Sequence, residues 1–291
     1  MKIIKPKSQT LIHLSVWLIL IIITVVIFLF MEKSKIELEN TLQKTKAQCA
    51  KAEKELCELE EKYNQLENKY LELERLKASQ KNSPVVYLTF DDGPSENTIK
   101  ILDILDRYSV KATFFVIGDS SLQAASIYRR IVDDGHAVGN HTYSHNYSEI
   151  YSSTEEFWKD IQKNDDLFFK NTGKHLDILR FPGGSNNTVS EKYCKNIMNT
   201  LVNQAVQKNI TYFDWNVSSL DAEAIVQKKE VIINAVIDGC KGKKCSIVLL
   251  HDNKKKTTTV EALPKIIESL KNDGFVFKTL STSTPSIQFL K

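Results

Sequence analysis

The sequence has few cysteines, little net charge and no internal repeat apart from a heptad pattern near its amino-terminal end. Its 291 residues include five cysteines, and a domain of this size does not need the disulfide framework that staples small secreted domains. No cysteine has a base beside it in a local motif typical of a nucleophilic thiol. A formal net charge of +3 gives no support for a nucleic-acid partner. The 42% apolar composition is that of a globular chain.

Residues 11–31 form an almost uninterrupted apolar run, LIHLSVWLILIIITVVIFLFM. A helix of this length crosses a bilayer core of ~30 Å, so we expect a transmembrane helix after a short tail at 1–10. Lysines precede the run and glutamates follow it, and the positive-inside rule therefore places the amino terminus in the cytoplasm and the rest of the chain outside. A cleaved signal peptide is the alternative, but the run exceeds an h-region of about 7 to 15 residues and no small-x-small site follows it.

Residues 32–79 carry apolar or small side chains that step by three and four, with Glu, Lys, Gln and Asn between them. This heptad spacing predicts a long exposed helix that forms a coiled-coil stalk of about 60 Å and a possible homodimer. A single charged helix, or one packed on another partner, is the alternative. Cys49 lies on the seam and would face the same residue of the second chain in a parallel dimer. A polar linker is expected at Ser79–Pro84, where the stalk ends. The seam positions are Leu38, Leu42, Thr45, Cys49, Ala52, Leu56, Leu59, Tyr63, Leu66, Tyr70 and Leu73.

The remainder, residues 83–291, alternates strand-like apolar runs with amphipathic stretches, which predicts an α/β domain with mostly parallel strands. Helices are expected between the strands, among them 120–134 and 154–171. This pattern indicates a barrel-like closure, and in such folds the chemistry lies at the carboxyl ends of the strands. The expected strands are 85–90, 112–116, 136–139, 177–180, 210–214, 246–250 and 275–278.

Two neighbouring carboxylates, Asp91 and Asp92, follow the first of these strands in VVYLTFDDGP. Like charges placed side by side repel, and a cation or a proton taken up by one of them relieves the repulsion. The pattern therefore indicates a site at the mouth of the strand. The alternative is a loop in which Asp and Gly serve only as turn residues.

Histidine and arginine also follow predicted strands. His141 and His145 are spaced i, i+4 in HTYSH, and a helical turn here would direct both imidazoles to one side, where they can hold one ion. Arg180 in LRFPGG ends another strand, and its guanidinium holds carboxylates in a fixed fork. His251 in IVLLHD ends a third. Ordinary structural histidines and a surface arginine are the alternatives for each signal taken alone.

Taken in order, TFDDGP, HTYSH, RFPGG, an Asp near a Trp in WNVSSLDA, and LLH closely resemble the motifs of the polysaccharide deacetylase family. This family is also known as carbohydrate esterase family 4, or the NodB homology domain. The resemblance covers residues 83–291 and implies a distorted (β/α) barrel that removes N-acetyl groups from amino sugars with a divalent cation. It implies Asp92, His141 and His145 as metal ligands, Asp91 as general base, Arg180 as the group orienting this base, and His251 as general acid.

The third and fourth motifs depart from the usual form. Asp221 stands where the family has an aspartate that tunes the acid, but Ala222 replaces the usual tryptophan. Gly183 replaces a common aromatic residue, and both changes predict a wider groove. The resemblance further implies that Pro182, Gly183 and Trp215 contact the substrate or its oxyanion.

The expected function is metal-dependent N-deacetylation of cell-wall glycan at the membrane, with N-acetylglucosamine of peptidoglycan as substrate. N-acetylmuramic acid or another surface polysaccharide is the alternative, and a scaffold that binds glycan without cleaving it is a second. An Asp-His-His donor set suits zinc, and also cobalt, nickel or manganese. Such an ion lowers the pKa of a bound water toward ~7 and polarises a carbonyl.

Overall fold

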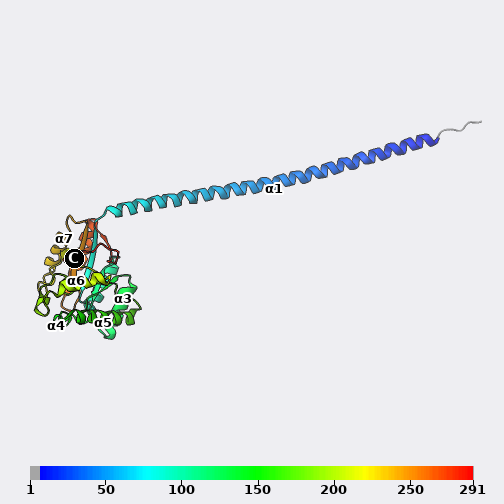
Figure 1. Cartoon of the computed structure of the whole chain (residues 1–291). Helices are drawn as coiled ribbons and strands as arrows, with labels where there is room; N and C mark the ends of the chain where they lie inside the picture. Colours follow the sequence, from blue (N-terminus) through cyan, green and yellow to red (C-terminus); the bar gives the residue numbers. More distant parts are fainter. Residues whose placement is uncertain (1–6, 291) are drawn as a thin grey trace, which may run out of the picture. The chain divides into compact units, whose positions relative to one another are not determined.

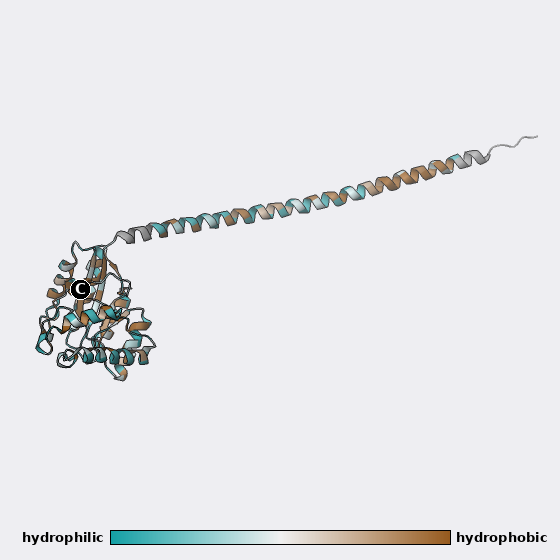
Figure 2. Cartoon of the chain, in the orientation of Figure 1, coloured by the Kyte–Doolittle hydropathy of each residue, from teal (hydrophilic) through white to brown (hydrophobic). Residues whose placement is uncertain are grey.

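The computed structural model describes residues 7–290, and the chain divides into two compact units, Met1–Ala78 and Ser79–Lys291. The described residues of the first unit belong to one continuous helix, α1 (Lys7–Asn82), drawn in blue to cyan in Figure 1. Within the described part of the chain, α1 is the one helix long and apolar enough to cross a membrane. Its apolar stretch, brown in Figure 2, corresponds to most of the predicted span 11–31. A membrane span is therefore plausible, and its orientation stays a prediction.

The seam residues of α1 lie on an exposed helix. Leu42 is 52% exposed, Leu59 62% and Leu66 67%, so no described residue of the chain covers them. Pairing as a coiled coil stays a prediction. The linker expected at Ser79–Pro84 is helical as far as Asn82, because nothing before Pro84 opposes a helix and a proline restricts mainly the residue that precedes it.

The second unit is built on an eight-stranded sheet in which every described strand pair is parallel. Its order is β5-β4-β3-β2-β1-β7-β6, with β8 paired to the first residues of β1. No described pairing joins β5 to β6, so the sheet does not close and the barrel is incomplete, and the barrel-like α/β fold expected for this unit is confirmed. The strands are β1 (Val85–Asp91), β2 (Thr113–Val116), β3 (Ala137–Asn140), β4 (Ile178–Leu179), β5 (Thr211–Tyr212), β6 (Val217–Ser218), β7 (Cys245–His251) and β8 (Val276–Phe277).

Helices follow most of these strands and bury their apolar stripes against the outer face of the sheet. Serine side chains cap three of them: Ser95, Ser121 and Ser153 each accept a backbone N–H of the following first turn, which satisfies a donor that the helix leaves free. The helices of this unit are α2 (Glu96–Arg107), α3 (Leu122–Asp133), α4 (Tyr147–Ile150), α5 (Thr154–Thr172), α6 (Ile197–Gln207), α7 (Lys229–Cys240) and α8 (Thr257–Asn272), with a 3-10 turn, η1 (Val189–Lys192).

Strand β1 shows how the alternation of side chains positions the site. Val86, Leu88 and Phe90 join the large core under the helices, whereas Tyr87 belongs to a smaller cluster on the opposite, inner face. Side chains alternate along a strand, so Asp91 shares the inner face with Tyr87. The carboxylate that ends the strand therefore points into the barrel.

The strands expected from the sequence are present with boundaries shifted by at most two residues. The short β6, together with α4 and η1, was not predicted. β6 has two residues and α4 and η1 have four each, and none of them lies in an apolar run of the kind that identified the other short strands.

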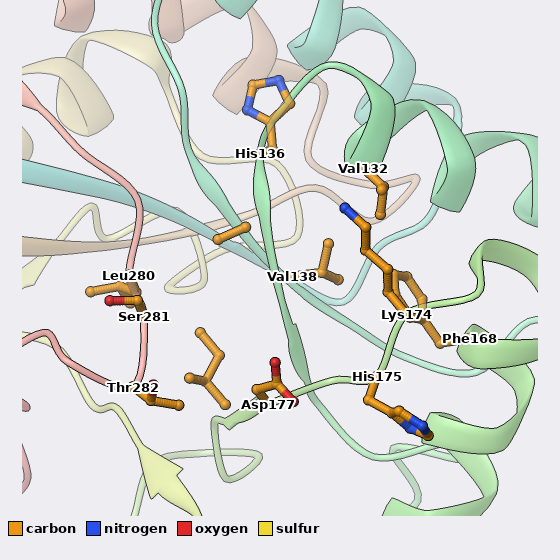
Figure 3. A pocket seen from close by; sticks show the side chains of 12 residues that line it. Val132, His136, Val138, Phe168, Lys174, His175, Asp177, Leu280, Ser281 and Thr282 are labelled. Carbon is orange, nitrogen blue, oxygen red and sulfur yellow. The ribbon is translucent and has the colours of Figure 1, made fainter.

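A cavity of ≈ 240 Å³ lies at the amino ends of β3 and β4 (Figure 3). Its lining residues His136 and Asp177 directly precede these two strands, whereas His141 and Arg180 directly follow them. Nδ1 of His136 accepts the N–H of Ala112 at 3.1 Å, and burial lowers the pKa of this imidazole to about 4. His136 is thus a neutral structural residue at the end of the sheet opposite the predicted site.

Candidate active site

The three predicted metal ligands meet at the carboxyl ends of β1 and β3. Their candidate ligand atoms in Asp92, His141 and His145 all lie within 4.8 Å of one another. Oδ1 of Asp92 is 3.5 Å from Nε2 of His141 and 3.3 Å from Nε2 of His145. This buried oxygen has no hydrogen-bond partner in the described chain, and an unpaired buried carboxylate oxygen facing two imidazole nitrogens fits a divalent metal.

The protonation of this cluster also suits a metal. Nδ1 of His141 lies 2.8 Å from the carbonyl oxygen of Arg180, so Nδ1 carries the proton and leaves the lone pair of Nε2 free. Burial lowers the pKa of His141 and keeps it neutral. Burial alone would raise the pKa of Asp92, but the surrounding imidazoles, including the protonated His251, and the hydrogen bond from Asn253 outweigh this effect and the pKa is lowered. The carboxylate is therefore ionised.

The segment that carries the two histidines is not the helical turn considered from their spacing. Thr142 and His145 have positive φ angles of 70° and 50°. The N–H groups of Tyr143 and Ser144 both donate to Oδ1 of Asp160 in α5, which holds the backbone in a loop. The imidazole centroids of His141 and His145 still lie 5.1 Å apart, because this loop rather than a helix directs them.

Arg180 lies inside the barrel with no exposed surface, so the surface alternative is wrong. Its Nη1 donates to Oδ1 of Asp91 at 2.9 Å and to Oγ1 of Thr89 at 2.6 Å. Its Nε and Nη2 donate to the carbonyl oxygens of Phe213 and Asp214. The other oxygen of Asp91, Oδ2, is 3.7 Å from Nε2 of His141. Arg180 thus fixes one oxygen of Asp91 and leaves the other facing the cluster.

His251 and Asp221 form a second pair at the carboxyl ends of β7 and β6. Nδ1 of His251 is 2.8 Å from Oδ1 of Asp221, and its backbone N–H donates to Oδ2 at the same distance. Burial lowers the pKa of His251, but the Asp221 carboxylate outweighs it and the pKa rises to about 9. The imidazole is therefore protonated at neutral pH, with Nε2–H as its free donor.

The loop after β4 carries two of the three residues predicted to contact the substrate or its oxyanion. Pro182 is buried, and its carbonyl accepts the hydroxyl of Tyr151 at 2.8 Å. Gly183 is exposed with φ 78°, and its N–H makes no hydrogen bond within residues 7–290. A Cβ built on Gly183 would lie 2.8 Å from the hydroxyl of Tyr147. Tyr147, in the segment that follows β3, thus takes the space that a side chain at position 183 would first enter, and the wider groove expected here stays a prediction.

Trp215 packs against the same loop. Its indole would contact a Cβ placed on Gly184 at 3.1 Å, and its ring lies 5.0 Å from that of Phe289, edge to face. Asp214 beside it accepts both the N–H and the hydroxyl of Ser185 and the N–H of Phe289. The carboxyl-terminal segment therefore braces the loop that carries Gly183.

Sequence reasoning missed several residues that hold the site. Nδ2 of Asn253 donates to Oδ2 of Asp92 at 3.0 Å, which leaves only Oδ1 toward the imidazoles. Thr259 donates to Oδ2 of Asp221 at 3.0 Å. The buried Nζ of Lys256 donates to the carbonyl of Asp221 at 2.7 Å. Asn253 directly follows His251 and Asp252 in the sequence, so its place near the site could have been predicted. The contacts of Thr259 and Lys256 with Asp221 could not, because they depend on how the chain folds.

Comparisons with known proteins agree with this geometry. A family model described as polysaccharide deacetylase matches residues 78–202. A peptidoglycan-N-acetylglucosamine deacetylase of Bacillus cereus is 33% identical over 203 residues, which cover 68% of each chain. The chain belongs to the polysaccharide deacetylase family. Deacetylases of this kind are hydrolases that act on amide bonds, so the expected enzyme class is confirmed.

Other relatives extend the comparison. A peptidoglycan-N-acetylglucosamine deacetylase of Listeria monocytogenes is 33% identical, but this chain spans 39% of its length and the match covers 69% of this chain. The crystal structure of the catalytic domain of such a deacetylase from Eubacterium rectale is 40% identical, with a TM-score of 0.68, and the match covers 71% of this chain and 92% of that domain. A carbohydrate esterase family 4 enzyme of Streptococcus mutans is 29% identical with a TM-score of 0.60, over 72% and 90% of the two chains.

Proposed function

We propose that this polysaccharide deacetylase removes the N-acetyl group from N-acetylglucosamine residues of peptidoglycan. The observation that supports this most is the meeting of three groups at one rim of the sheet: the Asp92–His141–His145 cluster, the Asp91–Arg180 pair and the Asp221–His251 pair. Amide hydrolysis needs a polarised carbonyl, a base and an acid, and each group fits one need. The names of the relatives from Bacillus cereus and Listeria monocytogenes support the choice of sugar.

Asp92, His141 and His145 would hold the divalent ion, with zinc as the first candidate and cobalt, nickel or manganese as the others. When bound, the ion would polarise the acetyl carbonyl and lower the pKa of the attacking water. The neutral tautomer of His141 and the ionised carboxylate of Asp92 suit this task without any change of protonation.

The remaining groups handle protons and charge. Asp91 takes the proton from the attacking water through Oδ2, since Arg180 occupies Oδ1. The exposed N–H of Gly183 donates to the oxygen that becomes negative. Nε2–H of His251 gives its proton to the leaving amine, and Asp221 keeps this imidazole charged until then. Trp215 and Pro182 support the loop on which the sugar rests.

The proposed location is the outer face of the cell membrane. Residues 11–31 would span the bilayer with the amino terminus in the cytoplasm, and residues 32–79 would form the stalk that presents the deacetylase domain to the wall. The exposed apolar seam of α1 supports pairing of two chains.

Acetate release from purified peptidoglycan tests the proposal. The metal-loaded full chain in detergent should release acetate, a chelator should stop the release, and added zinc should restore it. Mass spectrometry of muramidase fragments should place the loss of 42 mass units, about one acetyl group, on N-acetylglucosamine.

Two results would redirect the proposal. Loss of the acetyl group from N-acetylmuramic acid would identify the other amino sugar as substrate. Binding of peptidoglycan without acetate release under any metal would instead favour the glycan-binding scaffold.

A further inference from the structure

A groove of ≈ 360 Å³ begins at the candidate metal ligand Asp92 and is lined by the segments that follow β1, β2 and β7. Asp92 and Ser95 come from the first segment, Ile117 and Asp119 from the second. The third segment contributes Asn253, Lys254 and Lys255. We call this space the lysine groove. When the acetyl group of a sugar lies at the candidate metal cluster, the lysine groove therefore lies beside that sugar.

The turn that carries the two lysines is held in place from both sides. Asn253 donates to Asp92 through Nδ2, accepts from Nδ2 of Asn97 through its carbonyl at 2.8 Å, and accepts the N–H of Lys255 through Oδ1 at 3.1 Å. At the other side, the buried Nζ of Lys256 donates to the carbonyls of Asp221 and Ala224 at 2.7 and 2.9 Å. Lys254 and Lys255 are therefore the exposed tip of a fixed turn.

Neither lysine has a charged partner within the described part of the protein. Both side chains are exposed, and neither makes an ion pair or a side-chain hydrogen bond between residues 7 and 290. Asp119 on the facing segment uses Oδ1 to accept the N–H of Ser121. The groove thus places two unpaired cations beside one acid, apart from the carboxylate of Asp92.

We propose that the lysine groove binds a carboxylate carried by the part of the glycan next to the acetamido sugar, so that the enzyme prefers acidic glycan to a neutral N-acetylglucosamine polymer. The inference rests on the proposed function. A neighbouring muramic acid that carries no peptide offers such a carboxylate on its lactyl ether. Exposed ion pairs contribute modestly, so the two lysines together should give a preference of about fivefold to tenfold.

Binding and turnover can be measured separately with the full chain in detergent. The probes are an N-acetylglucosamine tetramer, a muramyl-containing tetrasaccharide of equal length, and the same tetrasaccharide with its carboxyl converted to a methyl amide. Isothermal titration gives Kd for each, and acetate release gives kcat/KM. The test variant is Lys254→Gln with Lys255→Gln. The control, Lys244→Gln with Lys265→Gln, removes two exposed charges at the amino end of β7 and on α8.

The wild-type and control proteins should bind the acidic tetrasaccharide about fivefold to tenfold more tightly than its methyl amide, and raised salt should reduce the difference. The test variant should bind all three probes alike and deacetylate the neutral tetramer within about twofold of wild type. Equal affinity of the wild type for acid and amide, or a preference that survives in the test variant, would overturn the inference.

The two proposals fail in different ways. Selective binding of the acid without acetate release from any probe would contradict the deacetylase function and leave the groove as an anion site. Acetate release with no discrimination between acid and amide would support the deacetylase function but contradict carboxylate binding in the lysine groove.

Discussion

Replacing Asp221 by Asn removes the charge that keeps the His251 imidazole protonated. Burial alone lowers the pKa of His251, and Asp221, 2.8 Å from its Nδ1, raises it to about 9. The difference from the ordinary value of 6.5 corresponds to about 3 kcal/mol. In Asp221→Asn burial still lowers the pKa of His251, and only the weaker effects of Asp91 and Asp92 still raise it, so this pKa should fall to near its ordinary value of 6.5.

A general acid works only while it is protonated, so the rate falls as pH rises through its pKa. The alkaline limb of kcat/KM should lie near pH 9 in the wild type and at least about two pH units lower in Asp221→Asn. At pH 8 only about 3% of the variant's imidazole would be protonated, which predicts a rate about 30-fold lower from this cause alone.

The assay is kcat/KM against pH on a soluble N-acetylglucosamine oligomer. Thr259→Val is the matched control, because it removes a 3.0 Å hydrogen bond to Asp221 but keeps the carboxylate charge. Its alkaline limb should stay within about half a pH unit of wild type. An unchanged limb in Asp221→Asn would refute the assignment of His251 as the acid that Asp221 tunes.

Three further changes probe other parts of the structure. Asn253→Leu should lower metal affinity by about 10- to 100-fold in a metal titration, whereas Asn97→Leu, which loses a bond only to the Asn253 carbonyl, should have a smaller effect. Gly183→Ala should lower kcat because its Cβ would meet the hydroxyl of Tyr147 at 2.8 Å with φ at 78°. Adding Tyr147→Phe should restore only part of the activity; full activity of Gly183→Ala alone would argue against this loop. If two α1 helices pair in parallel, oxidation should cross-link the chain through Cys49, and a chain that stays monomeric on a non-reducing gel counts against the dimer.

The parts of the fold that could be predicted are those in which several residues repeat one pattern. β1 and β7 are each seven residues long, and their apolar runs identified both strands and the polar groups at their ends. β6 has two residues, and its place at the edge of the sheet depends on pairing with β7, a contact across about thirty residues that no local pattern records.

The candidate site divides in the same way. Asp92, His141 and His145 could be expected to meet because each follows a strand, and the carboxyl ends of parallel strands share one edge of the sheet. The spacing of the two histidines suggested a helical turn, but the segment is a loop. Asp160 of α5 holds this loop through the backbone N–H of Ser144. The position of Tyr147 beside Gly183 could not be predicted either, because it depends on how two loops pack.

The division of labour between the neighbouring aspartates can be tested by measuring bound metal and acetate release in two purified variants. Asp91→Asn keeps all three candidate ligands and should retain the metal while losing activity. His141→Ala removes a buried ligand and should lose both. If both variants lose metal equally, Asp91 is not a separate base and the proposed roles of the pair are wrong.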